Sequence, residues 1–112
     1  MEESILTSIK LLLGVTEEYT PYDPQIIMHI NSVFMILNQL GVGPENPFTI
    51  SDKDAVWSDF IPDGDVEAVK SYVFMKVKLL FDPPTNGIVL GSYEKLVQEF
   101  EWRCNVKAEG ET

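Results

Sequence analysis

The side chains that most often do chemistry are scarce in this chain, which has one histidine, His29, and one cysteine, Cys104. A zinc site normally takes four Cys or His ligands, or several of these together with carboxylates. A Cys–His pair is formally open to the chain, but no spacing supports one. We therefore expect a partly buried polar histidine, a cysteine packed on a helix, and neither a metal nor a cofactor.

Two short acidic stretches, Asp52-Lys-Asp54 and Asp63-Gly-Asp65, invite a calcium interpretation. Neither has the spacing of an EF-hand loop, so helix caps and turns are the favoured interpretation. The stretch Gly41-Val-Gly-Pro44 follows a predicted helix instead of a strand, and it lacks the third glycine and the lysine of a phosphate loop. Paired carboxylates are inevitable among 18 acidic residues and indicate no glycosidase-like pair. The sequence thus predicts no catalytic residue and a protein that is not an enzyme.

Composition bounds the class of protein. The 112 residues, 45% of them hydrophobic, are enough for one domain with its own core. The formal charge of −10 argues against a surface that coats nucleic-acid phosphates or binds anionic membranes. A single cysteine excludes an internal disulfide and fits a reducing compartment.

Turn residues divide the chain into four helical segments, which predict a small all-α bundle in one domain. Gly14 and Gly41 are expected to end the first two helices, Asp23 to be the N-cap of the second, and Pro83 to stop the third. The expected segments run from about Ser4 to Leu13, from Pro24 to Leu40, from Asp63 or Asp65 to Asp82, and from a start between Thr85 and Ser92.

The second and third long helices are joined by an irregular connection over residues 42 to 62, which we expect to contain one helical turn from Asp54 to Phe60. Trp57, Phe60 and Ile61 should pin this connection to the core. The helical domain is expected to span residues 1–106, with residues 107–112 a disordered acidic tail. One side of the last helix is predicted to be lined by Leu90, Tyr93, Leu96, Val97, Phe100 and Cys104.

The most unusual feature is a stretch without charge, residues 24 to 44, in a chain that is 23% charged. A surface helix normally has an apolar stripe and a charged back, but here the back is made of uncharged polar residues. We therefore predict that this helix is covered on both sides, the second cover being another copy of the chain. Asn31, Met35 and Asn38 are the positions we expect nearest to that contact.

Three lysines, Lys70, Lys76 and Lys78, concentrate positive charge on the third long helix. They either extend around a core helix into solvent or pair with the acidic surface of a neighbouring copy, and the sequence favours neither. Trp102 lies off the main stripe of the last helix, so it is a further candidate for a subunit or partner interface.

Three blocks of the chain together resemble a known family. They are Ile30 to Pro44, Val69 to Pro84 with its Phe-Asp-Pro-Pro ending, and Glu99 to Val106. Their order and spacing resemble the small head–tail connector proteins of tailed bacteriophages and prophages, also called adaptor or head-completion proteins.

The resemblance implies a mostly helical adaptor without catalytic residues. In this family, about a dozen copies would form a ring beneath the portal protein. DNA would pass through the ring without specific binding, and tail-completion proteins would dock below it. The implied location is the virion neck, with assembly in the host bacterial cytoplasm and no membrane contact.

One alternative comes from a different class: a small acidic phage protein that mimics DNA and inhibits a host nucleic-acid enzyme. That hypothesis uses the charge of −10 but does not need the uncharged helix. A DNA mimic would spread its carboxylates at phosphate-like spacing over one face, whereas the acids of this sequence cluster at helix starts and in loops.

Overall fold

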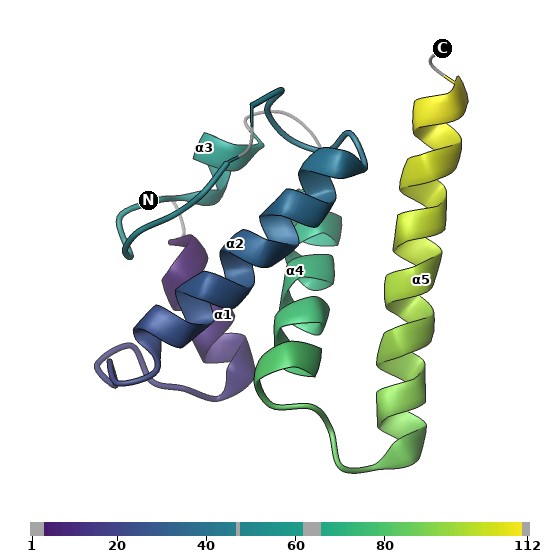
Figure 1. The fold of residues 1–112 in the computed structure, drawn as a ribbon. Helices are drawn as coiled ribbons and strands as arrows, with labels where there is room; N and C mark the ends of the chain where they lie inside the picture. Colours follow the sequence, from purple (N-terminus) through teal and green to yellow (C-terminus); the bar gives the residue numbers. More distant parts are fainter. Residues whose placement is uncertain (1–3, 47, 62–65, 111–112) are drawn as a thin grey trace.

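The computed structural model of the chain describes residues 4–46, 48–61 and 66–110, and within these ranges five helices are joined by turns and irregular segments. No strand occurs in these ranges, so the prediction of an all-α bundle is confirmed (Figure 1). The helices are α1 (Ile5–Leu13), α2 (Asp23–Gln39), α3 (Trp57–Phe60), α4 (Val66–Phe81) and α5 (Gly87–Gly110).

Helix α1 begins and ends where its sequence predicts. The side chain of Ser4 caps the first turn by accepting a hydrogen bond of 3.2 Å from the backbone N–H of Thr7. At the other end Gly14 adopts φ +86°, and the N–H of Val15 donates to the carbonyl of Lys10 at 2.8 Å. This is the closing motif in which a left-handed glycine lets the chain turn back onto the last carbonyls.

Helix α2 closes in the same way, at Gly41 with φ +84°, but it opens differently from the prediction. Asp23 is already the first helical residue, and Tyr22 holds the N-cap position without a side-chain cap. The expectation that Asp23 is the N-cap is therefore wrong by one position. Its carboxylate instead lies 2.8 Å from the ammonium of the buried Lys10 on α1, a partner that local sequence does not reveal.

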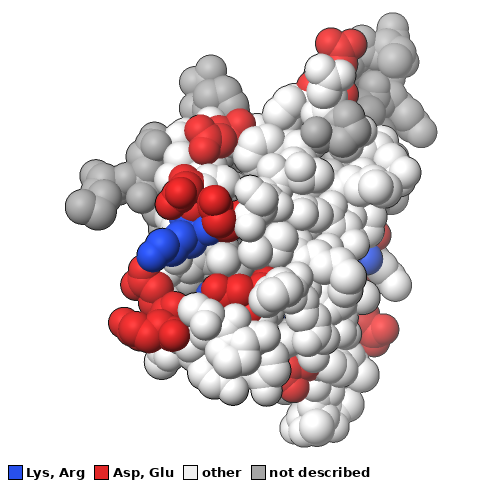
Figure 2. Space-filling model, turned by 60° about the vertical axis from the view of Figure 1, so that its left-hand side comes forward, with Lys and Arg blue, Asp and Glu red and all other residues white. Residues whose placement is uncertain are grey.

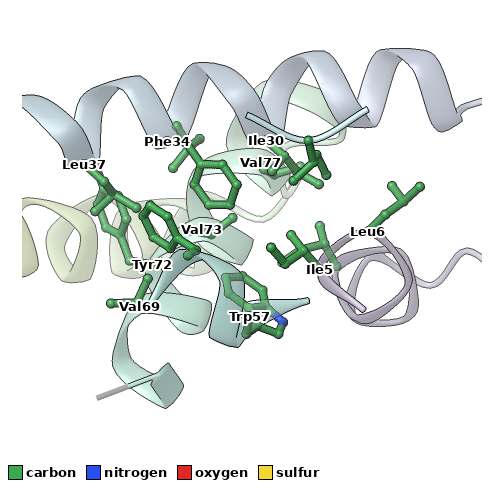
Figure 3. Close-up of a cluster of buried hydrophobic side chains, with 14 of the residues drawn as sticks. Ile5, Leu6, Ile30, Phe34, Leu37, Trp57, Val69, Tyr72, Val73 and Val77 are labelled. Atoms are coloured by element: carbon green, nitrogen blue, oxygen red, sulfur yellow. The ribbon is translucent and has the colours of Figure 1, made fainter. Parts of the chain in front are cut away.

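The core lies where α1, α2 and α4 meet (Figure 3). Side chains from one face of α2 point toward α4, with α1 and α3 closing the side of the cluster. Ile26, Ile30, Val33 and Leu37 of α2 are fully buried together with Phe34, while Leu40 just beyond the helix is only half-buried. The labelled core residues are Ile5, Leu6, Ile30, Phe34, Leu37, Trp57, Val69, Tyr72, Val73 and Val77.

The connection after α2 is pinned by aromatic side chains, as predicted. The indole N–H of Trp57 donates to the hydroxyl of Ser8 on α1 at 2.9 Å, which satisfies a buried polar group. Phe60 stacks on Phe34 of α2 with ring centroids 4.4 Å apart. The predicted turn is shorter than expected, since α3 contains only Trp57–Phe60.

The same packing explains the second glycine of the Gly-Val-Gly stretch. Gly43 has φ +90°, and a Cβ atom there would lie 2.5 Å from Cε1 of Phe60. A side chain at this position would be strained in its backbone and would also collide with the ring. The glycines thus serve chain reversal and close packing.

Helix α5 extends along one side of the molecule and packs on α4 (Figure 1). Tyr72 of α4 stacks on Phe100 with ring centroids 4.6 Å apart, and its hydroxyl donates to the carboxylate of Glu101 at 2.6 Å. Burial, and then the hydrogen bond to Glu101, raise the pKa of Tyr72 well above its ordinary value. This neutral phenol is therefore a stable link between the two helices.

The end of α4 and the start of α5 agree with the bounds predicted from the sequence. Helix α4 ends at Phe81, just before the proline pair, whereas its predicted start at Asp63 or Asp65 lies outside the described residues. Helix α5 begins at Gly87, where the side chain of Asn86 accepts from the N–H of Ile88 at 2.9 Å. The backbone of residues 107 to 110 continues this helix, and the expectation of a disordered tail over 107–112 stays a prediction.

Candidate interaction surface

Helix α2 presents an exposed face without a charged side chain on the side opposite its buried stripe. Met28 and Met35 are 57% and 59% exposed on this side. A residue two positions from a core residue lies about half a turn around the helix from it, so Met28 points away from the buried Ile30. We call this surface the α2 outer face; it consists of Gln25, Met28, Ser32, Met35 and Gln39, all exposed.

Exposing large apolar side chains to water is unfavourable in free energy, and on a protein surface charged neighbours normally separate them. On the α2 outer face the neighbours are amides and a hydroxyl. The hydroxyl of Ser32 already donates to the carbonyl of Met28 at 3.0 Å. The α2 outer face can therefore lose its water without stranding a charge, which is what a protein-binding surface requires.

The predicted contact residues separate into two groups. Met35 is exposed, but the amides of Asn31 and Asn38 are engaged within the chain. Asn31 donates to the carbonyl of Ile50 at 2.9 Å and accepts from its N–H at 2.8 Å. Asn38 donates to the carbonyls of Pro44 and Glu45, both at 3.2 Å. The sequence identifies Asn31 and Asn38 as uncharged polar residues on a helix, but it does not indicate that their amides hold the following connection in place.

The lysines of α4 also find partners in the same chain. The ammonium of Lys76 lies 3.5 Å from the carboxylate of Glu101 on α5, and that of Lys78 lies 3.5 Å from Asp82 one turn ahead. Lys70 is half-buried on the same helix. The pairing of these lysines with a neighbouring copy remains a prediction that the single chain does not test.

Helix α5 offers a second exposed surface. Among its described side chains Val97 is the one that is fully buried, and the others on the side facing α4 are only half-buried. Trp102 is 65% exposed, which agrees with its position off the main stripe, and Ile88 is 82% exposed. Leu96 was predicted on the packed side but is 50% exposed, because α5 packs mainly on the single helix α4 and one flank of its apolar stripe stays uncovered.

We call this second surface the α5 outer face. Sequence reasoning identified Trp102 but missed Ile88 and Leu96, since the helical period alone does not tell how much of a helix is covered. The surface consists of Ile88, Ser92, Lys95, Leu96, Glu99, Trp102 and Arg103, all exposed.

The other parts of the surface are weaker candidates for a functional site. An open cleft beside α1 is lined in part by Lys10, Asp23 and Lys53, but the buried ammonium of Lys10 is already held by Asp23 and by the carbonyl of Glu17 at 3.0 Å. His29 is half-buried with its ring beside Phe81, centroids 6.4 Å apart. Across the described ranges, no group of three His, Cys, Asp or Glu side chains is placed to hold a metal ion.

Charged side chains are distributed unevenly over the surface (Figure 2). On the face shown, the largest group of Asp and Glu lies at the left edge around basic side chains, smaller acidic groups lie near the other edges, and a broad central area carries little charge. In the part of the chain that the structure describes, no helix combines the length and apolarity that a membrane crossing would need.

A small helical bundle that exposes large apolar side chains on two helices has surfaces of the kind that bind other proteins. A protein-family model described as phage connector protein matches residues 5–111. The chain therefore belongs to the phage connector family, a family of structural proteins, and the resemblance found in the sequence is confirmed. Comparisons with curated proteins and with solved structures gave no match.

Proposed function

We propose that this protein is the head–tail connector that closes into a ring beneath the portal of a tailed phage. Several copies line a passage for DNA, and tail-completion proteins dock on the far side of the ring. The protein acts at the virion neck after assembly in the host cytoplasm, and it performs no chemical reaction. Membership of the connector family supports the general role.

The observation that carries the ring is the α2 outer face. A chain with a net charge of −10 repels its own copies, and this repulsion is weakest where a surface has no acid. Met28 and Met35 supply apolar area on such a surface. A ring joins two different faces of neighbouring copies at one repeated interface, and the α2 outer face would supply one of these two faces in every copy.

The acidic balance suits a conduit for DNA. A channel whose wall bound phosphates tightly would hold the genome back, because each neutralised phosphate adds affinity through released counterions. An acidic protein avoids that affinity. A DNA mimic would differ from a conduit, since an inhibitor must present its carboxylates to an enzyme, whereas a conduit only needs to avoid binding the genome.

The test is to image the purified protein with the portal protein of the same phage by electron microscopy, and to measure the mass of each species by light scattering. We expect the portal particle to gain a ring of density at one end when this protein is present. If the protein stays monomeric both alone and with portal, the proposed function is wrong. Tight binding to a host nucleic-acid enzyme under the same conditions would favour the DNA-mimic alternative instead.

A further inference from the structure

Two uncovered surfaces, the α2 outer face and the α5 outer face, lie on different sides of the molecule. Helices α2 and α5 each pack on α4, which lies between them (Figure 1). Met35 points away from the core on the first surface and Trp102 on the second, and both are more than half exposed, at 59% and 65%. If one of these surfaces bound the same surface of another copy, the other surface would remain exposed.

Symmetry limits how copies of one chain can cover both surfaces. A two-fold contact joins a patch to itself and closes a dimer, so pairing α2 with α2 would leave α5 in water. A head-to-tail contact joins two different patches of neighbouring copies, and it closes into a ring when the rotation allows. Two different unpartnered faces on separate sides of one chain are what a head-to-tail contact uses.

The charges of the two surfaces are compatible. The α2 outer face carries none, while the α5 outer face carries Lys95, Glu99 and Arg103. The carboxylate of Glu99 is paired with the guanidinium of Arg103 on the same helix. The exposed α5 surface thus has a small positive sum in a chain of net charge −10, so the acidic remainder of a neighbouring copy does not repel it when it contacts the uncharged α2 outer face.

Chemistry also favours apolar contact between them. Ile88, Leu96 and Trp102 offer branched and aromatic area at 82%, 50% and 65% exposure. The α2 outer face offers two flexible methionines, which adapt to the shape of such side chains and make favourable contacts with an aromatic ring. The long stems of Lys95 and Arg103 can lie over this apolar area while their charged ends stay in water or reach neighbouring acids.

We propose that the α2 outer face of one copy binds the α5 outer face of the next copy, so that the ring grows head to tail. The occupant of each surface is thus a second copy of this chain. The inference rests on the proposed ring and adds to it the identity of the two faces that join. It assigns Met35 and Leu96 to opposite sides of the same interface.

Chemical cross-linking tests the assignment. Met35→Cys and Leu96→Cys are made singly and together in a chain carrying Cys104→Ala, so that the new thiols are the only ones in this chain. Each protein is assembled with portal, treated with a flexible bis-maleimide, and analysed by denaturing electrophoresis. Circular dichroism and thermal melting verify that each variant is folded, and Cys104→Ser serves as a second background if Cys104→Ala does not fold.

The double variant should give a ladder of multimers, because each copy would be linked to the next on both sides. Each single variant should remain monomeric, and an equal mixture of the two should give a dimer that contains one copy of each. As a matched control, Thr49→Cys replaces Met35→Cys, since Thr49 is exposed in the connection and outside both faces; its pair with Leu96→Cys should give no ladder.

The other outcomes separate this inference from the proposed function. A dimer from Met35→Cys alone would mean that α2 faces pair with each other, and a product joining Met35→Cys to portal would mean that portal covers this surface. Either result overturns the head-to-tail assignment. So do rings seen by microscopy without a ladder, which leave the proposed function standing. If nothing assembles on portal, the proposed function fails and the assignment fails with it.

Discussion

Replacing Met35 by glutamate should prevent assembly while leaving the folded monomer intact. Met35 lies in the middle of the α2 outer face and is 59% exposed in the single chain. Surface substitutions away from special contacts change the free energy of unfolding by about 0.5 kcal/mol or less. Met35→Glu should therefore keep the helix content and the thermal midpoint of the original protein.

The effect on the interface is much larger. Complete burial of a methionine side chain contributes about 1.5–3 kcal/mol, so closing the exposed part of Met35 contributes about 1–2 kcal/mol. The variant loses this contribution and must also remove water from a carboxylate, at a cost of several kcal/mol that Lys95 and Arg103 of a neighbouring α5 would offset only in part. A total of about 4 kcal/mol corresponds to about a thousandfold weaker association at each interface.

Light scattering and electron microscopy with and without portal measure this change. Met35→Leu is the control for shape and should assemble, because it keeps an apolar side chain of similar volume. Thr49→Glu is the control for charge and should also assemble, because it adds the same carboxylate outside the α2 outer face. Normal assembly of Met35→Glu would show that this face is not an interface.

Four further outcomes are expected. Asn31→Ala should destabilise the monomer by about 1–3 kcal/mol in urea unfolding, because the backbone N–H and carbonyl of Ile50 lose their partner. Tyr72→Phe should cost about 1–2 kcal/mol by the same measurement, since the hydrogen bond to the partly exposed Glu101 is lost; an unchanged midpoint would mean that this link does not hold α5. Deleting residues 107–112 should leave the thermal midpoint nearly unchanged, and a large decrease would show that they dock in the fold. Finally, micromolar protein should not shift duplex DNA in a gel at about 150 mM salt, where a persistent shift would contradict the acidic conduit.

Local signals in the sequence were sufficient for most helix bounds. Gly14 and Gly41 end their helices because a left-handed residue is needed to return the chain to its last carbonyls, and glycine adopts that conformation without a Cβ clash. Pro83 ends α4 because it cannot continue the hydrogen-bond pattern. Such signals act over a few residues, so they can be recognised without knowing the fold.

The sequence also indicated the uncharged character of α2, since composition does not depend on packing. It did not indicate which of its polar residues were free. Asn31 and Met35 lie one turn apart, but Asn31 binds Ile50, 19 positions further along the chain, and Met35 remains exposed.

Tertiary structure alone decided the partners that come from distant segments. The amide of Asn31, the ammonium of Lys76 and the first-turn carboxylate of Asp23 are all engaged by residues that only the fold brings near. Leu96 is half exposed for a related reason: an apolar period predicts which side of a helix prefers burial, but the number of helices packed against that side determines how much of it is covered.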